Sequence, residues 1–509
     1  IKPVEVGLTL LLCLLMGLAV SMTADMRLSW QFAMVAAFFF CTALVVFPQK
    51  KQLLIIAWIL IHPLSIEKVI EVGSPLMPEF FPPALVISGS DIILFMLLLL
   101  LLFESLILQR RRVWSFPKAM TPLFLFVAWN LIVFLLHPIS TSSILALVHL
   151  LKITLFVIIM ISAISTEHDY KIVLQAIAVS VAIQVVLVFY SSFSGDIIRL
   201  SSKITNSIMS FAGEESGLSH IRATGTVGHV NQEASFLTFF SLPLIVLPFL
   251  YHRFQRILFW LLLCSVPLAV FLTYSRSAWL AMIVSILVII GLSFYYRLLS
   301  IRTWVYLFPF ILTAILSLPI ISKPVLDRII HGDEGATSSR IRSIELALDL
   351  TKKHPITGVG PGLFSTASLA YYPPQQITAP MRSALVPPNP LANQFGRLEI
   401  SQIKIGTKIF AFPLPVHNKF LLVLSELGVV GLLLFLWFQW RIFSHIQQTI
   451  KHSFGPTLWA GIGLLSAFFA SLIYMNLDLF SDDKTMQILL IVPILAMSLH
   501  QISLQDCQE

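Results

Sequence analysis

Charged side chains are scarce in this 509-residue chain: 11% of its residues are Asp, Glu, Lys or Arg, whereas 57% are hydrophobic. A soluble globular protein carries about 25% charged residues. This deficit, with a mean hydropathy of +0.90, excludes an ordinary soluble protein and predicts an all-α protein that crosses a membrane many times. We interpret the net charge of +8 as basic loops that hold the topology against anionic lipid, and not as a nucleic-acid-binding surface.

Cysteine is equally scarce, and several catalytic signatures are missing. The cysteines are Cys13, Cys41, Cys264 and Cys507. They form no CxxC pair, so the sequence predicts neither a disulfide framework nor a cysteine metal site. The chain also has no HExxH and no GxSxG motif. The glycine-rich stretch 358–362 lacks the lysine of a phosphate-binding loop, and we interpret it as a turn.

Long apolar runs recur along the whole chain, and a run of about 17–22 residues can cross a bilayer as a helix. We predict about 12–14 transmembrane helices, the first of them an uncleaved span and not a signal peptide. The candidate spans lie near 6–24, 30–47, 52–66, 90–108, 119–137, 143–164, 171–193, 230–250, 257–274, 278–296, 303–321, 416–440, 456–476 and 485–501. The third of these is short.

The distribution of Lys and Arg over the loops predicts the orientation of the protein, because basic loops mark the cytoplasmic side. Basic loops occur at 49–51, 110–112, 252–256, 297–302 and 441–451. They fall on one side of a fourteen-span topology, so we expect both termini in the cytoplasm. The long segments 67–89, 194–229 and 322–415 are then on the outer side.

These boundaries divide a single membrane domain into four parts. They are N-terminal transmembrane helices with an outer loop (1–229), central transmembrane helices (230–321), an extracytoplasmic loop (322–415) and C-terminal transmembrane helices (416–509). The loop is too long for an idle connector. Within it, residues 340–353 form an apolar stripe at helical spacing, with a serine at 338 or 339 as cap. The stripe consists of Ile341, Ile344, Leu348 and Thr351, widened by Ala347 and Leu350. We expect this amphipathic helix to lie on the bilayer surface or against the bundle.

Two arginines stand at predicted outer ends of spans. Arg222 lies in a polar, glycine-bearing stretch just before the span at 230–250, and Arg276 lies in the tight turn between two spans. A guanidinium binds phosphate through two parallel hydrogen bonds, so both suit an anionic head group. The alternatives are an arginine that extends its charge to the interface, for Arg222, and an ordinary interfacial anchor, for Arg276.

His417 and Asn418 open the span at 416–440, where the long outer segment enters the bilayer. Ionisable groups at such a place are costly to bury, and imidazole transfers protons near neutral pH. The alternative is an interfacial histidine bonded to loop backbone. Glu426 follows nine residues after His417, which is about 900° of rotation and roughly 13 Å of rise. We therefore expect Glu426 to contact another element and not to pair with His417.

Four stretches occur in an order that resembles a known family. They are RATGTVGHVNQEA (222–234), TYSRSAWLA (273–281), SSRIRSIELALDLTKKHPITGVGPGLF (338–364) and HNKFLLVLSELGVVG (417–431). Together they cover roughly residues 215–440 and resemble the O-antigen ligase and O-antigen polymerase family of bacterial envelopes. One departure is His229-Val230-Asn231, where the family often has histidine-proline-asparagine.

The resemblance implies a GT-C-like membrane glycosyltransferase of the bacterial cytoplasmic (inner) membrane whose active site faces outward. Such an enzyme moves a glycan from undecaprenyl diphosphate to a lipid A core sugar or to a second lipid-linked glycan, with inversion and with no metal or other cofactor. The resemblance implies that Arg222 and Arg276 bind the diphosphate and that His417 is the general base or a positioning group. Secondary candidates are Asn418, Arg340, His229 and Glu426.

Other functions stay open on the sequence alone. A transporter of a small anion or a lipid-linked glycan would show ionisable residues at mid-bilayer depth or broken helices, and Lys152 and Glu426 are the main candidates. Within the enzyme class, a protein O-glycosyltransferase is a third possibility beside ligase and polymerase. Asp478, Asp482 and Asp483 leave a divalent-cation site as a minor alternative.

Overall fold

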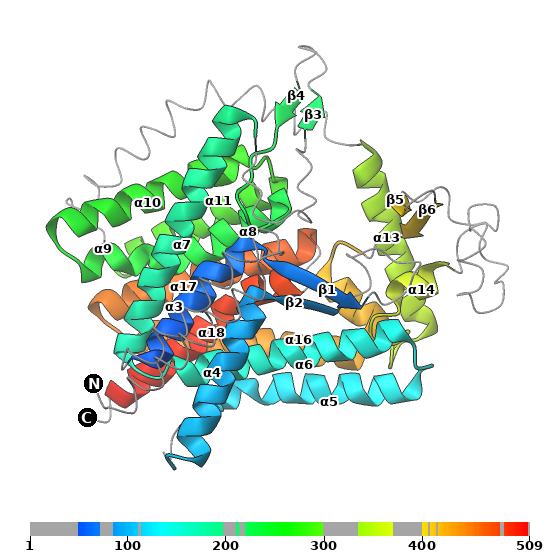
Figure 1. Cartoon of the computed structure of the whole chain (residues 1–509), viewed down its shortest axis with the longest axis horizontal. Helices are drawn as coiled ribbons and strands as arrows, with labels where there is room; N and C mark the ends of the chain where they lie inside the picture. The colour runs from blue at the N-terminus through cyan, green and yellow to red at the C-terminus, as the bar shows by residue number, and fades with distance from the viewer. Residues whose placement is uncertain are drawn as a thin grey trace, which may run out of the picture.

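The computed structural model of the chain is a bundle of membrane helices (Figure 1). It describes residues 49–71, 85–109, 113–196, 210–212, 219–298, 334–369, 400–405, 408–413, 416–478 and 483–506. Within these residues, ten helices are long and apolar enough to cross a membrane. The predicted all-α, multi-pass fold is therefore confirmed.

The ten helices coincide with ten of the predicted spans. In chain order they are α4 (Gly89–Leu106), α5 (Thr121–Leu136) with the preceding turn η2 (Lys118–Met120), α6 (Thr141–Ala163), α7 (Glu167–Ser194), α8 (Val230–Ser241) continued by η3 (Leu242–Val246) and α9 (Leu247–Leu250), α10 (Arg253–Leu272), α11 (Arg276–Tyr295), α16 (Lys419–His452), α17 (Gly455–Leu477) and α18 (Asp483–Asp506). The predicted spans 6–24, 30–47 and 303–321 lie outside the described residues. The short run at 52–66 is α3 (Lys50–Ile61) followed by the turn η1 (His62–Leu64).

Polar residues at the chain positions just before the helices set where several of them begin. Ser88, Ser140 and Thr166 each accept a hydrogen bond from the backbone N–H three residues later and start α4, α6 and α7 with reciprocal capping boxes. Helix α7 ends at Gly195, whose φ of 71° is open to glycine at little cost. These local signals fix the helix ends independently of the apolar patterns between them.

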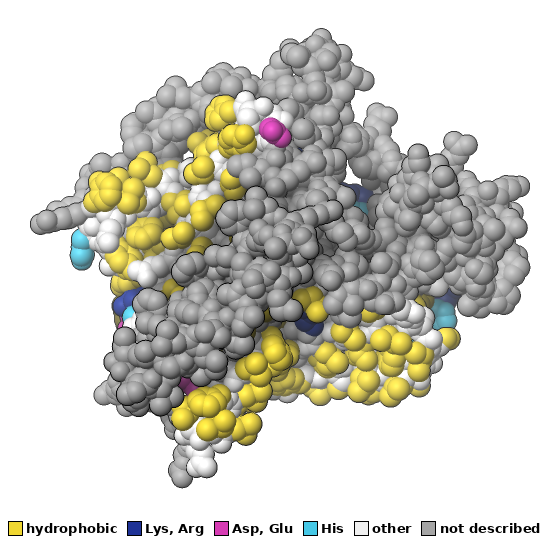
Figure 2. Space-filling model, in the orientation of Figure 1, with side chains coloured by type: hydrophobic (Ala, Val, Ile, Leu, Met, Phe, Trp, Pro, Cys, Tyr) yellow, Lys and Arg dark blue, Asp and Glu magenta, His cyan; other side chains and the backbone are white. Residues whose placement is uncertain are grey.

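The central and peripheral helices differ in how much of their surface meets protein. In α8, α17 and α18, 83% of the residues of the apolar stretch are buried inside the bundle, against 22% in α10 and 28% in α4. The exposed side chains of the outer helices are large and apolar, as expected for lipid contact. Figure 2 shows such side chains spread over the lower face of the bundle and over its upper left side. The core is therefore built around α8, α17 and α18.

Three short antiparallel hairpins occur in the segments that were predicted to lie outside the membrane. They are β1 (Glu67–Glu71) with β2 (Leu85–Ser88), β3 (Ser210–Ala212) with β4 (Ser219–Ile221), and β5 (Ile400–Ile405) with β6 (Lys408–Pro413). The last of these segments also holds α13 (Glu334–Lys353) and α14 (Phe364–Leu369). In Figure 1, α13, α14 and the β5–β6 hairpin stand together at one side of the bundle.

The predicted amphipathic helix exists as α13, but its packed face covers only part of the predicted stripe. The buried side chains are Ser343, Leu346, Ala347 and Leu350. Ala347 and Leu350 belong to the predicted stripe, whereas its other members are exposed: Ile341 is 53%, Ile344 37% and Leu348 42% accessible. The helix also begins at residue 334, so the serines at 338 and 339 lie inside it and do not cap it. Apolar side chains occur on both faces, and contact with Val416 and Leu422 at the start of α16 selects the buried face.

Candidate functional site

The stretch 222–229, which leads into α8, is held by buried polar side chains. Glu233 of α8 is fully buried, and its Oε2 accepts hydrogen bonds from the backbone N–H groups of Gly225 (3.0 Å) and Val227 (3.2 Å). The Gln184 amide of α7 accepts from the Thr226 N–H (2.9 Å) and donates to the Thr226 hydroxyl (2.8 Å). A Cβ at Gly225 would collide with both Gln184 and Glu233, so this position requires glycine.

A second pair of polar residues holds the same stretch from another side. The Ser65 hydroxyl bonds to the carbonyl oxygens of Thr226 (2.9 Å) and Val227 (2.8 Å). Lys484 of α18, which is only 9% accessible, donates to Ser65 and to the Val227 carbonyl. Its ammonium also acts on the Glu233 carboxylate, so a cation and an anion hold one loop inside the bundle. Sequence reasoning missed Ser65, Gln184, Glu233 and Lys484, although Gln184 and Glu233 are polar residues inside apolar runs and could have been noticed as such.

Arg222 joins this stretch to the turn that carries Arg276. Its Nε donates to the carbonyl of Thr273 (3.0 Å), and its Nη2 donates to Oδ1 of Asn231 (2.9 Å). The backbone N–H of Ala223 donates to the Leu272 carbonyl (3.0 Å), so two consecutive residues bind the end of α10. Arg276 is the first residue of α11, three positions after Thr273. The tertiary structure thus brings the two predicted phosphate-binding arginines to facing sides of one turn.

His229 is the N-cap residue of α8, and its Nδ1 accepts a hydrogen bond from the Asn231 N–H (3.2 Å). Part of the ring surface is accessible, yet the surrounding protein removes much of its hydration. This desolvation, followed by the nearby charges of Arg222 and His417, lowers the pKa of His229 to about 4. The ring is therefore neutral near pH 7, with its proton on Nε2.

The departure from the family pattern next to His229 fits the helix geometry. Val230 is the first residue of α8, and this helix position accepts proline or another residue because its N–H has no partner inside the helix. His229 itself keeps the extended backbone of an N-cap residue, with φ −67° and ψ 147°. The valine therefore leaves the local turn intact.

Helix α16, which coincides with the span predicted at 416–440, is broken at Gly428. Gly428 has φ 68° and ψ −171°, a conformation that only glycine adopts readily. The rings of Phe420 and Phe435 lie 5.7 Å apart, whereas fifteen residues of straight helix would separate them by roughly 22 Å. The short arm (residues 419–427) thus folds back along the long arm (429–452), and His417 and Asn418 stand at its free end.

The backbone groups released by this break find partners in other elements. The carbonyls of Ser425 and Glu426 accept from the N–H groups of Val359 (2.9 Å) and Gly360 (2.9 Å), and the N–H of Val429 donates to Pro355 (2.9 Å). The glycine-rich stretch 358–362, predicted as a turn, is such a turn and has positive φ at Gly358, Gly360 and Gly362. Irregular backbone inside a membrane protein persists only where it is satisfied in this way.

Asn418 and Glu426 both fix the short arm. The Asn418 Oδ1 accepts from the Leu421 N–H (3.0 Å) as the helix cap, and its Nδ2 donates to Oδ1 of Asn476 (3.2 Å) at the end of α17. Glu426 accepts from the Phe364 N–H (3.3 Å), so it contacts the glycine turn, in line with the predicted separation from His417. Both secondary candidates therefore have structural partners.

The structure does not connect Arg340 to these residues. Arg340 lies on α13, and among the described contacts its side chain meets none of Arg222, His229 and His417. By contrast, Arg222 and His417 both act electrostatically on His229, and Arg276 shares the turn that Arg222 binds. Within the described part of the chain, no group of three or more His, Cys, Asp or Glu side chains can hold a metal ion. Of the three aspartates proposed for such a site, Asp482 lies outside the described residues.

The comparisons with known proteins concern the middle of the chain. Residues 257–390 match the sequence model of a family described as O-Antigen ligase. The matched region contains Arg276, Arg340 and the glycine turn, while Arg222, His229 and His417 lie outside it. No curated protein shows significant similarity to the chain. The predicted resemblance to this family is confirmed by the match.

Proposed function

We propose that this multi-pass membrane protein, whose residues 257–390 match the O-Antigen ligase family model, transfers a glycan from undecaprenyl diphosphate to an acceptor hydroxyl. The acceptor is a lipid A core sugar or a second lipid-linked glycan. We place the reaction at the outer face of the bacterial cytoplasmic membrane, and it needs no metal. The observation that supports the proposal is that Arg222 and His417 both act on His229, while Arg222 also binds the turn that carries Arg276.

The two arginines act on the leaving group in this proposal. The diphosphate gains negative charge as the bond to the sugar breaks, and fixed guanidinium groups stabilise that charge. Arg222 is oriented in advance, because Thr273 and Asn231 accept two of its five N–H donors. The neutral His229 adds an N–H donor without adding a second positive charge next to Arg222.

In this proposal, His417 acts on the acceptor hydroxyl. The acceptor oxygen attacks the anomeric carbon as the bond from that carbon to the diphosphate oxygen breaks, and the electron pair of that bond leaves with the diphosphate. His417 takes the proton of the acceptor hydroxyl as general base, or holds the hydroxyl in line. Attack from the face opposite the diphosphate inverts the sugar carbon.

The test uses the full chain in lipid nanodiscs with purified undecaprenyl-diphosphate-linked glycan and candidate acceptors. We expect His417→Ala to lower the rate of transfer by roughly 10²–10⁴-fold, because it removes the proton acceptor. Arg276→Ala should weaken turnover strongly as well, since it removes charge stabilisation. Equal insertion and thermal stability of the variants is the control. Product formation at the wild-type rate by both variants would contradict the proposal.

One observation favours the transporter alternative: a broken helix, as in α16, is a feature of many transporters. The two intramembrane charges do not strengthen that alternative. Lys152 forms an ion pair with Asp91 (2.8 Å) and donates to the Val86 carbonyl (3.0 Å), and Glu426 binds the glycine turn. Flux of anion or lipid-linked glycan across proteoliposomes without covalent transfer would favour the transporter, and transfer without flux the enzyme.

A further inference from the structure

A cavity of about 160 Å³ lies in the angle between the two arms of α16, next to the proposed site. We call it the elbow cavity. Its wall includes Lys419 and Val423 of the short arm and Phe435 and Phe438 of the long arm. Mostly apolar side chains of α5, α6, α17 and α18, together with the glycine turn and Ser365, complete the wall. No described lining residue comes from α10 or α11. The cavity exists because the break at Gly428 folds one arm of α16 back on the other.

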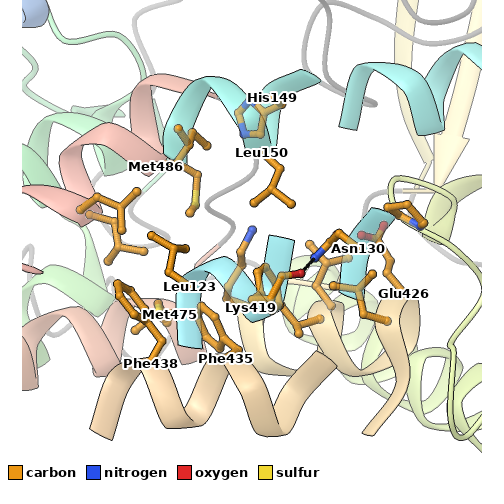
Figure 3. Close-up of a pocket in the computed structure, with 18 of the residues that line it drawn as sticks. Leu123, Asn130, His149, Leu150, Lys419, Glu426, Phe435, Phe438, Met475 and Met486 are labelled. Carbon is orange, nitrogen blue, oxygen red and sulfur yellow. Dashed lines mark hydrogen bonds between the residues drawn. The ribbon is translucent and has the colours of Figure 1, made fainter. Parts of the chain in front are cut away.

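A cation, Lys419, faces the middle of the elbow cavity, and its charge also acts on the Glu426 carboxyl group in the same wall. Figure 3 shows the ammonium end of Lys419 pointing into the space, with His149 of α6 on the facing wall. Glu426 stands at the rim and accepts from the Phe364 N–H. Asn130 donates to the Phe126 carbonyl of its own helix (2.8 Å; dashed in Figure 3). A positive group in an apolar wall is complementary to an anion with an apolar body.

The elbow cavity begins where the proposed site ends. Lys419 directly follows Asn418, and the cavity residue Met475 directly precedes Asn476, to which Asn418 donates. His417 lies two residues before Lys419 in the chain, and its charge acts on His229 next to Arg222. Arg222 and Arg276 belong to the side of α8, α10 and α11, whereas Lys419 belongs to the side of α5 and α6.

We propose that the elbow cavity binds the phosphate end of a second lipid, the acceptor, with Lys419 as its anion-binding group. This proposal rests on the proposed transferase function. A transferase with a base between donor and acceptor needs the acceptor on the far side of that base from the donor diphosphate. The cavity is smaller than the roughly 300–1,000 Å³ that encloses a whole small ligand, so it takes one end of a longer molecule. The apolar wall suits a prenyl or acyl chain.

Binding is measured by native mass spectrometry on the full chain in lipid nanodiscs, with undecaprenyl monophosphate, monophosphoryl lipid A, phosphatidylglycerol and inorganic phosphate as separate probes. We expect Lys419→Met to weaken binding of a prenyl phosphate or of lipid A by at least about tenfold, as loss of a charge-assisted bond does. Lys419→Arg should restore most of it. Leu150→Trp fills the cavity without a change of charge and should give the same loss. Lys171→Met, which removes an exposed lysine paired with Glu167, is the matched control and should bind normally.

Each outcome of the binding measurement either supports or overturns the proposed acceptor site. Selective binding of undecaprenyl monophosphate supports a polymerase-type acceptor, and selective binding of lipid A supports a ligase-type acceptor. Equal binding of phosphatidylglycerol or of inorganic phosphate, or wild-type binding by Lys419→Met, would overturn the proposal. So would an equal loss in Arg276→Ala, because the probe would then occupy the donor site. In transfer assays, Lys419→Met should raise KM for the acceptor and leave KM for the donor unchanged. The binding measurement does not require catalytic turnover. A protein that binds the lipid but transfers no glycan would therefore disprove the transferase function and not the binding site.

Discussion

Two histidines stand at the starts of two helices in the proposed site, but the protein holds them in different ways. His229 ends a stretch whose backbone is bound by buried side chains, namely Glu233, Gln184 and the Lys484–Ser65 pair. His417 precedes an arm whose end at the Gly428 break is bound by the backbone of the glycine turn, with Asn418 and Glu426 as additional side-chain contacts. The first region depends on the chemistry of particular side chains, and the second on backbone conformations that exclude most residues.

The largest effect should come from breaking the backbone-held region. Gly428→Ala places a Cβ against the backbone of Ile356 and forces a strained φ, which alone costs on the order of 1–3 kcal/mol. We expect loss of thermal stability and loss of glycan transfer together, since the short arm carries His417. The control is Gly291→Ala in α11, where a Cβ meets nothing within 4 Å. Normal melting and activity in Gly428→Ala would show that the break is not required.

A smaller effect is expected in the region held by side chains. Glu233→Gln keeps one acceptor oxygen for the loop but removes the negative charge beside Lys484, and we expect about 1–3 kcal/mol of destabilisation. The double variant Glu233→Gln, Lys484→Met should lose less than the sum of the single variants if the two charges are coupled. Thermal unfolding in nanodiscs measures both. Strict additivity would argue against the coupling.

The smallest effect is expected for the pH dependence of stability, through His229. The pKa of His229 is lowered to about 4 in the folded protein from its ordinary value of 6.5, so the unfolded state binds more protons between these values. The contribution of His229 to stability is therefore full above about pH 6.5 and is lost as the pH falls towards about 4. His229→Asn, which can still cap α8, should reduce this dependence modestly. Unfolding midpoints from pH 4 to pH 8 provide the check, and identical profiles would contradict it.

The sequence predicted much of the membrane fold and little of the geometry that assembles the site. Apolar length located ten described helices, because a run long enough to cross the bilayer is a local signal. The packed face of α13 was predicted only in part, because apolar residues lie on both of its sides. Contact with Val416 and Leu422 buries one side of the predicted stripe and leaves the other exposed. Arg222, Arg276 and His417 were selected one by one, and no spacing along the chain indicated that Thr273 would accept from Arg222.

What the sequence by itself determined is a many-helix membrane protein with a polar outer segment, because a run of apolar residues of that length is stable only inside a bilayer. It also supplied the four stretches that resemble the O-antigen ligase and polymerase family. The tertiary structure alone decided that α16 breaks at Gly428 and folds back to form the elbow cavity. A glycine permits such a break, but the carbonyls of Ser425 and Glu426 can leave the helix only because Val359 and Gly360, from a distant part of the chain, donate to them.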